Sequence, residues 1–286
     1  MFRKLSSIFT DIKLAHTVFA LPFALASADI AFGGKYDIKT LLLILVCMFT
    51  ARSSAMAFNR WLDRDIDSVN PRTKERSIPS GKVNPRDMLI FVIINSLCFV
   101  AASWFLNILA FALSPVALAV VLGYSYLKRF TPYSHLALGL SLSIAPVGAW
   151  IAINGSFDIL PVILAVGVVF WVAGFDIIYS CQDVEFDSTA GLHSIPKRFG
   201  INGALMISTL FHLVTIGILI VFGHLADLGI VYMGLLGVIA LILLVEHVIV
   251  TPDKLSLVGV AFFTLNGFVS ILFFLAVFLD RLYTGR

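Results

Sequence analysis

Charged residues are scarce in this chain. They make up 13% of its 286 residues, whereas hydrophobic residues make up 59%. An ordinary soluble domain carries roughly 25% charged residues. One soluble core cannot bury so many apolar side chains, so a water-soluble globular domain is excluded. The net charge is only +3 and no basic stripe with interleaved aromatic residues is present, so no nucleic-acid partner is expected.

Cysteine is also rare. Cys47, Cys98 and Cys181 are odd in number and lie inside apolar runs, which argues against a disulfide framework or a cysteine metal site. The six histidines, His135 among them, are scattered without the spacing of metal ligands. We therefore expect the histidines to be packing or helix-end residues.

Long apolar runs, by contrast, recur along the whole chain. A membrane hydrocarbon core of about 30 Å needs a helix of about 20 apolar residues. The sequence thus predicts an all-α integral membrane protein. Its nine expected spans are roughly 13–33, 39–61, 87–108, 111–127, 134–153, 158–180, 203–223, 227–248 and 256–280. A count of eight stays open, because the break between the third and fourth spans carries no charge and rests on Asn107, Pro115 and the total apolar length.

The distribution of the 20 lysines and arginines predicts the orientation. With nine spans, Arg52 lies inside a span, and one face of the membrane receives Lys35, Lys39, Arg281 and Arg286. The remaining fifteen lie on the face that carries the amino terminus. Because positive residues accumulate on the cytoplasmic side, we expect a multi-pass protein of the cell inner membrane with its amino terminus in the cytoplasm.

Acidic residues gather where two of the expected spans end. Asn59, Asp63 and Asp67 follow one another at intervals of four residues, so in a helix their side chains form one stripe. A second group closes the sixth span and consists of Asp176, Asp183 and Asp187. The intervals of seven and four residues that separate these three also separate Arg52, Asn59 and Asp63. This suggests one domain over residues 1–286 with a pseudo-repeat that relates spans one to four to spans five to eight.

The chemistry that suits two facing acidic stripes is the binding of Mg²⁺ together with a diphosphate. Magnesium prefers oxygen ligands and is usually held by one or two carboxylates and by substrate phosphates. Arg72, Arg76 and Lys128 are expected at the same level and offer donors to phosphate oxygens. Charged residues off the stripes are expected to be solvated, namely Arg64, Asp65, Lys74 and Glu185.

Arg52 and Asp176 are expected one to two turns inside apolar spans. An ionised side chain there costs roughly 2.5–3.5 kcal/mol on insertion scales, so such residues usually face a cavity and serve a function. A purely structural pairing of the two with each other is the alternative.

Three segments resemble motifs of the UbiA superfamily of intramembrane prenyltransferases. "NRWLDRDIDSVNPRTKERSIPSG" resembles its NxxxDxxxD signature, with Asn59, Asp63 and Asp67 in the three places. "DIIYSCQDVEFDSTAGLHSIPKRFG" resembles its YxxxDxxxD motif, with Tyr179 preceding the two aspartates. "YSYLKRFT" resembles the loop in which Tyr124 would precede a phosphate-binding Lys128. The similarity extends from "KLAHTVFALPFAL" to about residue 200.

The resemblance implies a bundle of nine spans around a central cavity with a polar cap. It also implies Mg²⁺-dependent transfer of a polyprenyl group from its diphosphate to a lipophilic acceptor. The expected metal ligands are Asn59, Asp63, Asp67, Asp183 and Asp187, and the expected diphosphate ligands are Lys128, Arg72, Arg76 and Tyr124. Arg52 and Asp176 would face the acceptor, with Asp176 orienting it or taking its proton.

Within the superfamily, "DRDID" and "HTVFALPFAL" look most like 4-hydroxybenzoate polyprenyltransferases. The closely similar enzymes that prenylate a naphthoate precursor of menaquinone are the alternative. Two more distant alternatives are a CDP-alcohol phosphatidyltransferase, whose aspartate motif is absent, and an ion-coupled transporter, whose acidic residues would lie at mid-bilayer. The expected partners are therefore a polyprenyl diphosphate, an aromatic acid and membrane lipid.

Overall fold

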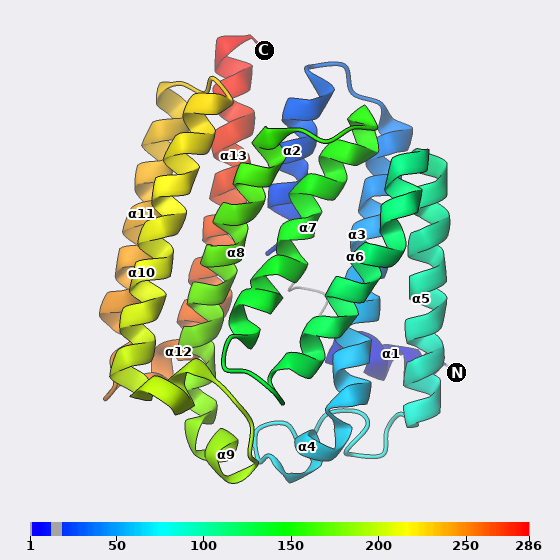
Figure 1. The fold of residues 1–286 in the computed structure, drawn as a ribbon, viewed down its shortest axis with the longest axis vertical. Helices are drawn as coiled ribbons and strands as arrows, with labels where there is room; N and C mark the ends of the chain where they lie inside the picture. Colours follow the sequence, from blue (N-terminus) through cyan, green and yellow to red (C-terminus); the bar gives the residue numbers. More distant parts are fainter. Residues whose placement is uncertain (1, 13–18, 286) are drawn as a thin grey trace.

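In the computed structural model, which describes residues 2–12 and 19–285, every regular element is a helix (Figure 1). The long elements are α2 (Leu21–Phe32), α3 (Ile38–Leu62), α5 (Pro85–Leu106), α6 (Ile108–Leu127), α7 (Ser134–Asn154), α8 (Ile159–Ser180), α10 (Ile195–Leu225), α11 (Ile230–Ile249) and α13 (Asn266–Thr284). The short elements are α1 (Phe2–Asp11), α4 (Arg64–Val69), η2 (Cys181–Asp183), α9 (Val184–Thr189), η3 (Leu255–Leu257), α12 (Val258–Val260) and the π-helical η4 (Ala261–Leu265).

Eight helical segments of the described chain are long and apolar enough to cross a membrane. The ninth expected span corresponds to α2, which is apolar but has only 12 residues. Part of that span, residues 13–18, lies outside the described residues. The chain is thus a multi-pass all-α membrane protein, and the expected number of spans agrees approximately with the structure.

The uncertain break between the third and fourth spans is present at Asn107. Its side-chain oxygen accepts a hydrogen bond from the Ala110 N–H at 2.9 Å and so caps α6, while its amide nitrogen donates to the Ile151 carbonyl of α7 at 2.8 Å. Pro115, in contrast, lies inside α6 and not at the break. Proline cannot donate to the carbonyl one turn earlier, but the Ser114 hydroxyl donates to that Phe111 carbonyl at 2.8 Å. The side-chain bond explains why the helix continues through the proline.

Polar side chains also cap the first turns of α3 and α8, two of the helices whose other ends carry the acidic motifs. Asp37 accepts from the Thr40 N–H at 3.0 Å, and Asp158 accepts from the Leu160 N–H at 2.9 Å. Each satisfies one of the amide groups that a helix leaves unpaired in its first turn. These caps mark where α3 and α8 start.

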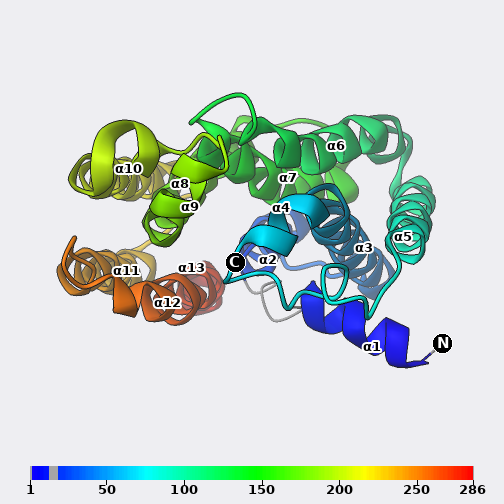
Figure 2. The same ribbon diagram turned by 90° about the horizontal axis from the view of Figure 1, so that it is seen from below.

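The long helices pack side by side, and Figure 2 shows them from the end of the bundle. α3 packs on α5, α7 packs on α8, and α8 packs on α10. α2 lies between α7 and α13, where Phe23 stacks on Phe273 and packs against Trp171. The pseudo-repeat of spans stays a prediction.

Two short helices, α4 and α9, lie at the same end of the bundle and follow α3 and α8 directly (Figure 1). We call this end, with residues 63–84 and 181–194, the polar end. α4 lies over the middle of the bundle when it is seen from this side (Figure 2). The two acidic motifs therefore come together in space although they are far apart in sequence.

Candidate active site

A cavity of about 890 Å³ runs through the bundle from the polar end. Its walls include Asp67 on α4 and, towards the opposite end, Ile151 and Phe157. All the residues that the sequence nominates for the site line it: Arg52, Asn59, Asp63, Asp67, Arg72, Arg76, Tyr124, Lys128, Asp176, Asp183 and Asp187. The structure thus brings the whole predicted set to one cavity, polar at one end and apolar beyond.

Asp63 occupies the junction at which α3 ends and α4 begins, and its side chain is almost fully buried. It forms an ion pair with Lys128, and its second oxygen accepts from Arg129 Nη2 at 2.9 Å. One turn earlier, the Asn59 amide donates to Asp63 at 3.1 Å and lies 3.4 Å from the Ser125 hydroxyl. The first stripe is therefore held by basic residues that follow α6.

Asp67 is the second carboxylate of this stripe and is also buried. Both of its oxygens lie 2.7 Å from Arg76 Nη1. The loop that carries Arg76 is in turn attached to α1, because the Ser77 N–H donates to Asp11 at 2.7 Å. Arg76 is thus positioned beside the carboxylate that it neutralises.

Arg72 joins the two acidic motifs across the mouth of the cavity. Its Nε and Nη2 donate to the two oxygens of Asp183 at 3.0 and 2.6 Å, and its Nη1 donates to the Tyr179 hydroxyl at 2.7 Å. Burial lowers the pKa of Arg72, but the hydrogen bond and the negative charge of Asp183, together with Tyr179, raise it above its usual value. The guanidinium group therefore stays charged in its bidentate contact.

Asp187 lies on α9 and is half-buried at the cavity wall. Its backbone carbonyl accepts from the Leu192 N–H at 3.0 Å and from Lys197 Nζ at 3.1 Å. The intervening turn passes through Gly191, whose φ of 69° is the left-handed conformation that glycine adopts most readily. This turn holds the second motif over the cavity.

The donor set suits magnesium by its chemistry, since it consists of carboxylates and an amide. Within the described residues, however, no three acidic, histidine or cysteine side chains converge as the ligands of one metal ion. Asp63, Asp67 and Asp183 each contact a basic side chain instead. The site is therefore charge-balanced by its own arginines and lysine, and these would have to turn to phosphate oxygens when the carboxylates bind a metal.

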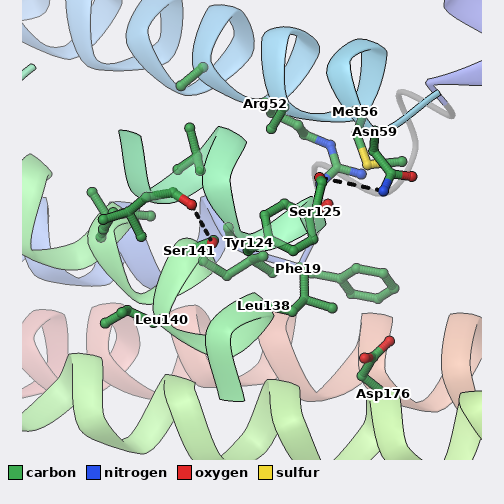
Figure 3. A pocket seen from close by; sticks show the side chains of 18 of the residues that line it. Phe19, Arg52, Met56, Asn59, Tyr124, Ser125, Leu138, Leu140, Ser141 and Asp176 are labelled. Carbon is green, nitrogen blue, oxygen red and sulfur yellow. Dashed lines mark hydrogen bonds between the residues drawn. The ribbon is translucent and has the colours of Figure 1, made fainter. Parts of the chain in front are cut away.

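Deeper in the cavity, Arg52 projects from α3 and Asp176 lies on the opposite wall, with Tyr124 between them (Figure 3). Arg52 Nε is buried and has no hydrogen-bond partner. Asp176 does not pair with Arg52 but contacts Nδ1 of His135 on α7 at 2.7 Å. The structural alternative, in which Arg52 and Asp176 neutralise each other, is therefore not what the structure shows, although both residues line the cavity.

Two of these partners were not expected from the sequence. Arg129 follows Lys128 directly, so its basic charge next to a predicted ligand was the available signal. His135 had no such signal, because it is a single histidine at the start of an apolar helix. Asp65, as expected for a residue off the stripe, is exposed, with only a 3.7 Å contact to Arg64.

The sequence profile of the UbiA prenyltransferase family matches residues 20–272. The chain belongs to the UbiA prenyltransferase family. The match includes most of the last third of the chain, in which the sequence motifs give no signal. This UbiA protein is therefore a membrane prenyltransferase.

Known proteins agree with this assignment. The chain is 33% identical over 221 residues to the 4-hydroxybenzoate octaprenyltransferase of Aeromonas salmonicida (strain A449). This match covers 77% of this chain and 76% of that protein. The apo structure of a UbiA homolog from Aeropyrum pernix K1 superposes with a TM-score of 0.81 at 28% identity and covers 96% of this chain and 99% of the other. A UbiA homolog from Archaeoglobus fulgidus bound to GPP and Mg²⁺ has the same fold, with a TM-score of 0.75 at 19% identity, and covers 96% of this chain and 99% of the other.

Proposed function

We propose that this UbiA protein transfers a polyprenyl group from its diphosphate to an aromatic acid, with 4-hydroxybenzoate as the acceptor, in quinone biosynthesis. The observation that carries the proposal is the sequence of groups along one cavity. Carboxylates and basic side chains line its mouth, Arg52 and Asp176 follow deeper in, and an apolar chamber lies beyond. This order matches a diphosphate, an aromatic acid and an isoprenoid chain.

Mg²⁺ bound at the mouth would neutralise the diphosphate and make it a better leaving group. Asn59, Asp63, Asp67, Asp183 and Asp187 would hold it, directly or through water. The binding of GPP and Mg²⁺ by the Archaeoglobus fulgidus homolog supports this role.

Lys128, Arg72 and Arg76 would then turn to the phosphate oxygens. Each lies beside a carboxylate of the site, so a small side-chain rotation is enough. Tyr124, one turn before Lys128 on α6, would bind the diphosphate with them. These donors stabilise the negative charge that develops as the bond between C1 of the prenyl chain and the diphosphate oxygen breaks.

At the depth of Arg52, the acceptor carboxylate would pair with the guanidinium group, which lines the cavity. An electron-rich ring carbon of the acceptor bonds to C1 of the prenyl group, and the ring then loses a proton to a base. Asp176 on the facing wall would orient the phenol or accept that proton. Aromatic side chains near this point, such as Phe175 and Phe262, would shield the allylic cation from water.

The location proposed for this protein is the cell inner membrane, with the polar end in the cytoplasm. The excess of lysine and arginine on that side supports it. A polyprenyl chain is soluble in lipid, so an intramembrane cavity lets it bind without entering water.

Product analysis tests the proposal. Purified protein in liposomes is given geranyl diphosphate and Mg²⁺ with 4-hydroxybenzoate and a hydroxynaphthoate in competition, and the lipid products are identified by mass spectrometry. Prenylated 4-hydroxybenzoate should dominate. Prenylated naphthoate would replace the acceptor assignment with the menaquinone alternative, and no prenylated aromatic of either kind would overturn the proposal.

Metal removal is the second part of this test. We expect EDTA to abolish turnover and added Mg²⁺ to restore it, because the leaving diphosphate needs the cation. The thermal unfolding temperature should barely change with EDTA, since the carboxylates are already paired with basic side chains. Undiminished turnover in EDTA would contradict the metal assignment.

A further inference from the structure

We propose that His135 is a positioning residue for acceptor prenylation, which it serves by holding Asp176 in one orientation. The inference rests on the proposed function of this cavity. His135 lies in the first turn of α7 at the polar end, and its side chain is 5% exposed, against 22% for that of Asp176. Asp176 therefore presents the larger surface to the cavity, and His135 acts from behind it.

The two ring nitrogens of His135 have different partners, and these fix their roles. The Ile195 N–H points at Nε2 with an N-to-N distance of 3.4 Å. Because an amide N–H can only donate, Nε2 is the accepting nitrogen of the neutral ring. Nδ1 then carries the hydrogen and donates it to Asp176 Oδ2 at 2.7 Å.

The Ile195 contact also has a structural reason. Ile195 is the first residue of α10, where amide groups have no partner within the helix, and it is buried. A buried N–H without an acceptor is costly, so His135 satisfies it while its other nitrogen reaches Asp176. One imidazole thus connects three helices, α7, α8 and α10.

The consequence for Asp176 is that one oxygen is occupied and the other is left for the acceptor. A carboxylate free to rotate would present either oxygen in many directions. Held at Oδ2 by the Nδ1–H, it keeps Oδ1 for the acceptor, on the cavity wall opposite Arg52 (Figure 3). The phenol or ring proton of an acceptor whose carboxylate is paired with Arg52 would meet that oxygen.

Two substitutions separate the roles of the ring nitrogens. The amide nitrogen of His135→Asn takes the place of Nδ1, so this variant keeps the donor to Asp176 and loses the acceptor for Ile195. The amide oxygen of His135→Gln reaches the place of Nε2, so this variant keeps the acceptor and loses the donor. Each retains one hydrogen bond, which makes them matched controls for each other.

The experiment measures kcat and KM for both substrates with 4-hydroxybenzoate and geranyl diphosphate in liposomes. His135→Gln should lower kcat about 10- to 100-fold, as expected for loss of orientation at the reacting group. His135→Asn should stay within about threefold of the wild type. The Kd of a non-hydrolysable geranyl thiolodiphosphate with Mg²⁺ should be unchanged in both, because the diphosphate ligands are untouched.

Three results would overturn the inference or its basis. Equal activity of the Asn and Gln variants would overturn the positioning role alone. Parallel losses of activity, analogue affinity and unfolding temperature in both variants would show that His135 is only a structural brace. A wild-type protein that prenylates no aromatic acid would overturn the proposed function as well, and this outcome is distinct because it needs no variant.

Discussion

Buried acidic side chains occur at several places in this molecule, and two of these places differ in the partners of the acid. At the polar end, Asp63 is 1% exposed and contacts Lys128 and Arg129, whose own side chains are 31% and 29% exposed. In a second place, Glu246 in the last turn of α11 is fully buried. Its Oε1 accepts from the Asn266 amide at 2.8 Å, and Asn266 in turn accepts from the Trp171 indole at 2.8 Å.

The partners of Asp63 suit a substrate-binding site, whereas those of Glu246 form a structural network. Lysine and arginine side chains beside a cavity can exchange a carboxylate for a phosphate. Glu246, Asn266 and Trp171 do not line the cavity, and their bonds join α8, α11 and α13 directly. Burial of an acid is thus no sign of function by itself. The charge and the accessibility of its partners distinguish a functional acid from a structural one.

The strongest test of this comparison removes one charge from the site. Asp63→Asn should lower turnover at least about 100-fold, because a metal and diphosphate position loses a charged ligand. The adjacent Asp65→Asn removes the same charge from an exposed residue and should leave turnover within about twofold. The measurement is prenyl transfer at saturating Mg²⁺, and equal effects of the two substitutions would refute the distinction between them.

A smaller effect is expected at the mouth of the cavity. Arg72→Lys keeps the charge but loses the forked contact with Asp183, so we expect KM for the prenyl diphosphate to rise about tenfold. Lys74→Arg, a swap of the same two residue types at an exposed place in the same loop, is the control. An unchanged KM in Arg72→Lys would remove Arg72 from the diphosphate site.

In the structural network the effect should fall on stability and not on turnover. Asn266→Ala leaves the Trp171 N–H and the Glu246 carboxyl without their partner, which costs about 1–3 kcal/mol per buried group. That corresponds to about 2–4 °C of unfolding temperature per kcal/mol. Affinity for a prenyl thiolodiphosphate should not change, and a large loss of affinity would show that the network reaches the cavity.

The smallest effect is expected for Glu246→Gln. The glutamine oxygen can still accept from Asn266, and the substitution replaces the unpartnered Oε2 by an amide group of the same shape. We expect an unfolding temperature within about 2 °C of the wild type, in contrast to Asn266→Ala. A fall as large as that of Asn266→Ala would mean that the charge of Glu246 stabilises the bundle.

The spans and the acidic stripes were predictable because both depend on local regularities. A membrane helix needs about 20 apolar residues in succession, and intervals of four residues place side chains on one helix face. Asn59, Asp63 and Asp67 follow directly from that periodicity. The helical course of α6 through Pro115 did not, since it depends on one side-chain bond from Ser114 to the Phe111 carbonyl.

The sequence alone therefore determined the class of protein, the approximate spans and the residues that meet at one cavity. Only the tertiary structure decided which of them touch. Arg72 bonds to Asp183 at a separation of 111 residues, and His135 bonds to Asp176 at a separation of 41. Such pairs follow from how helices and loops pack in three dimensions and from the rotamers this packing allows, and helical periodicity carries no information about either.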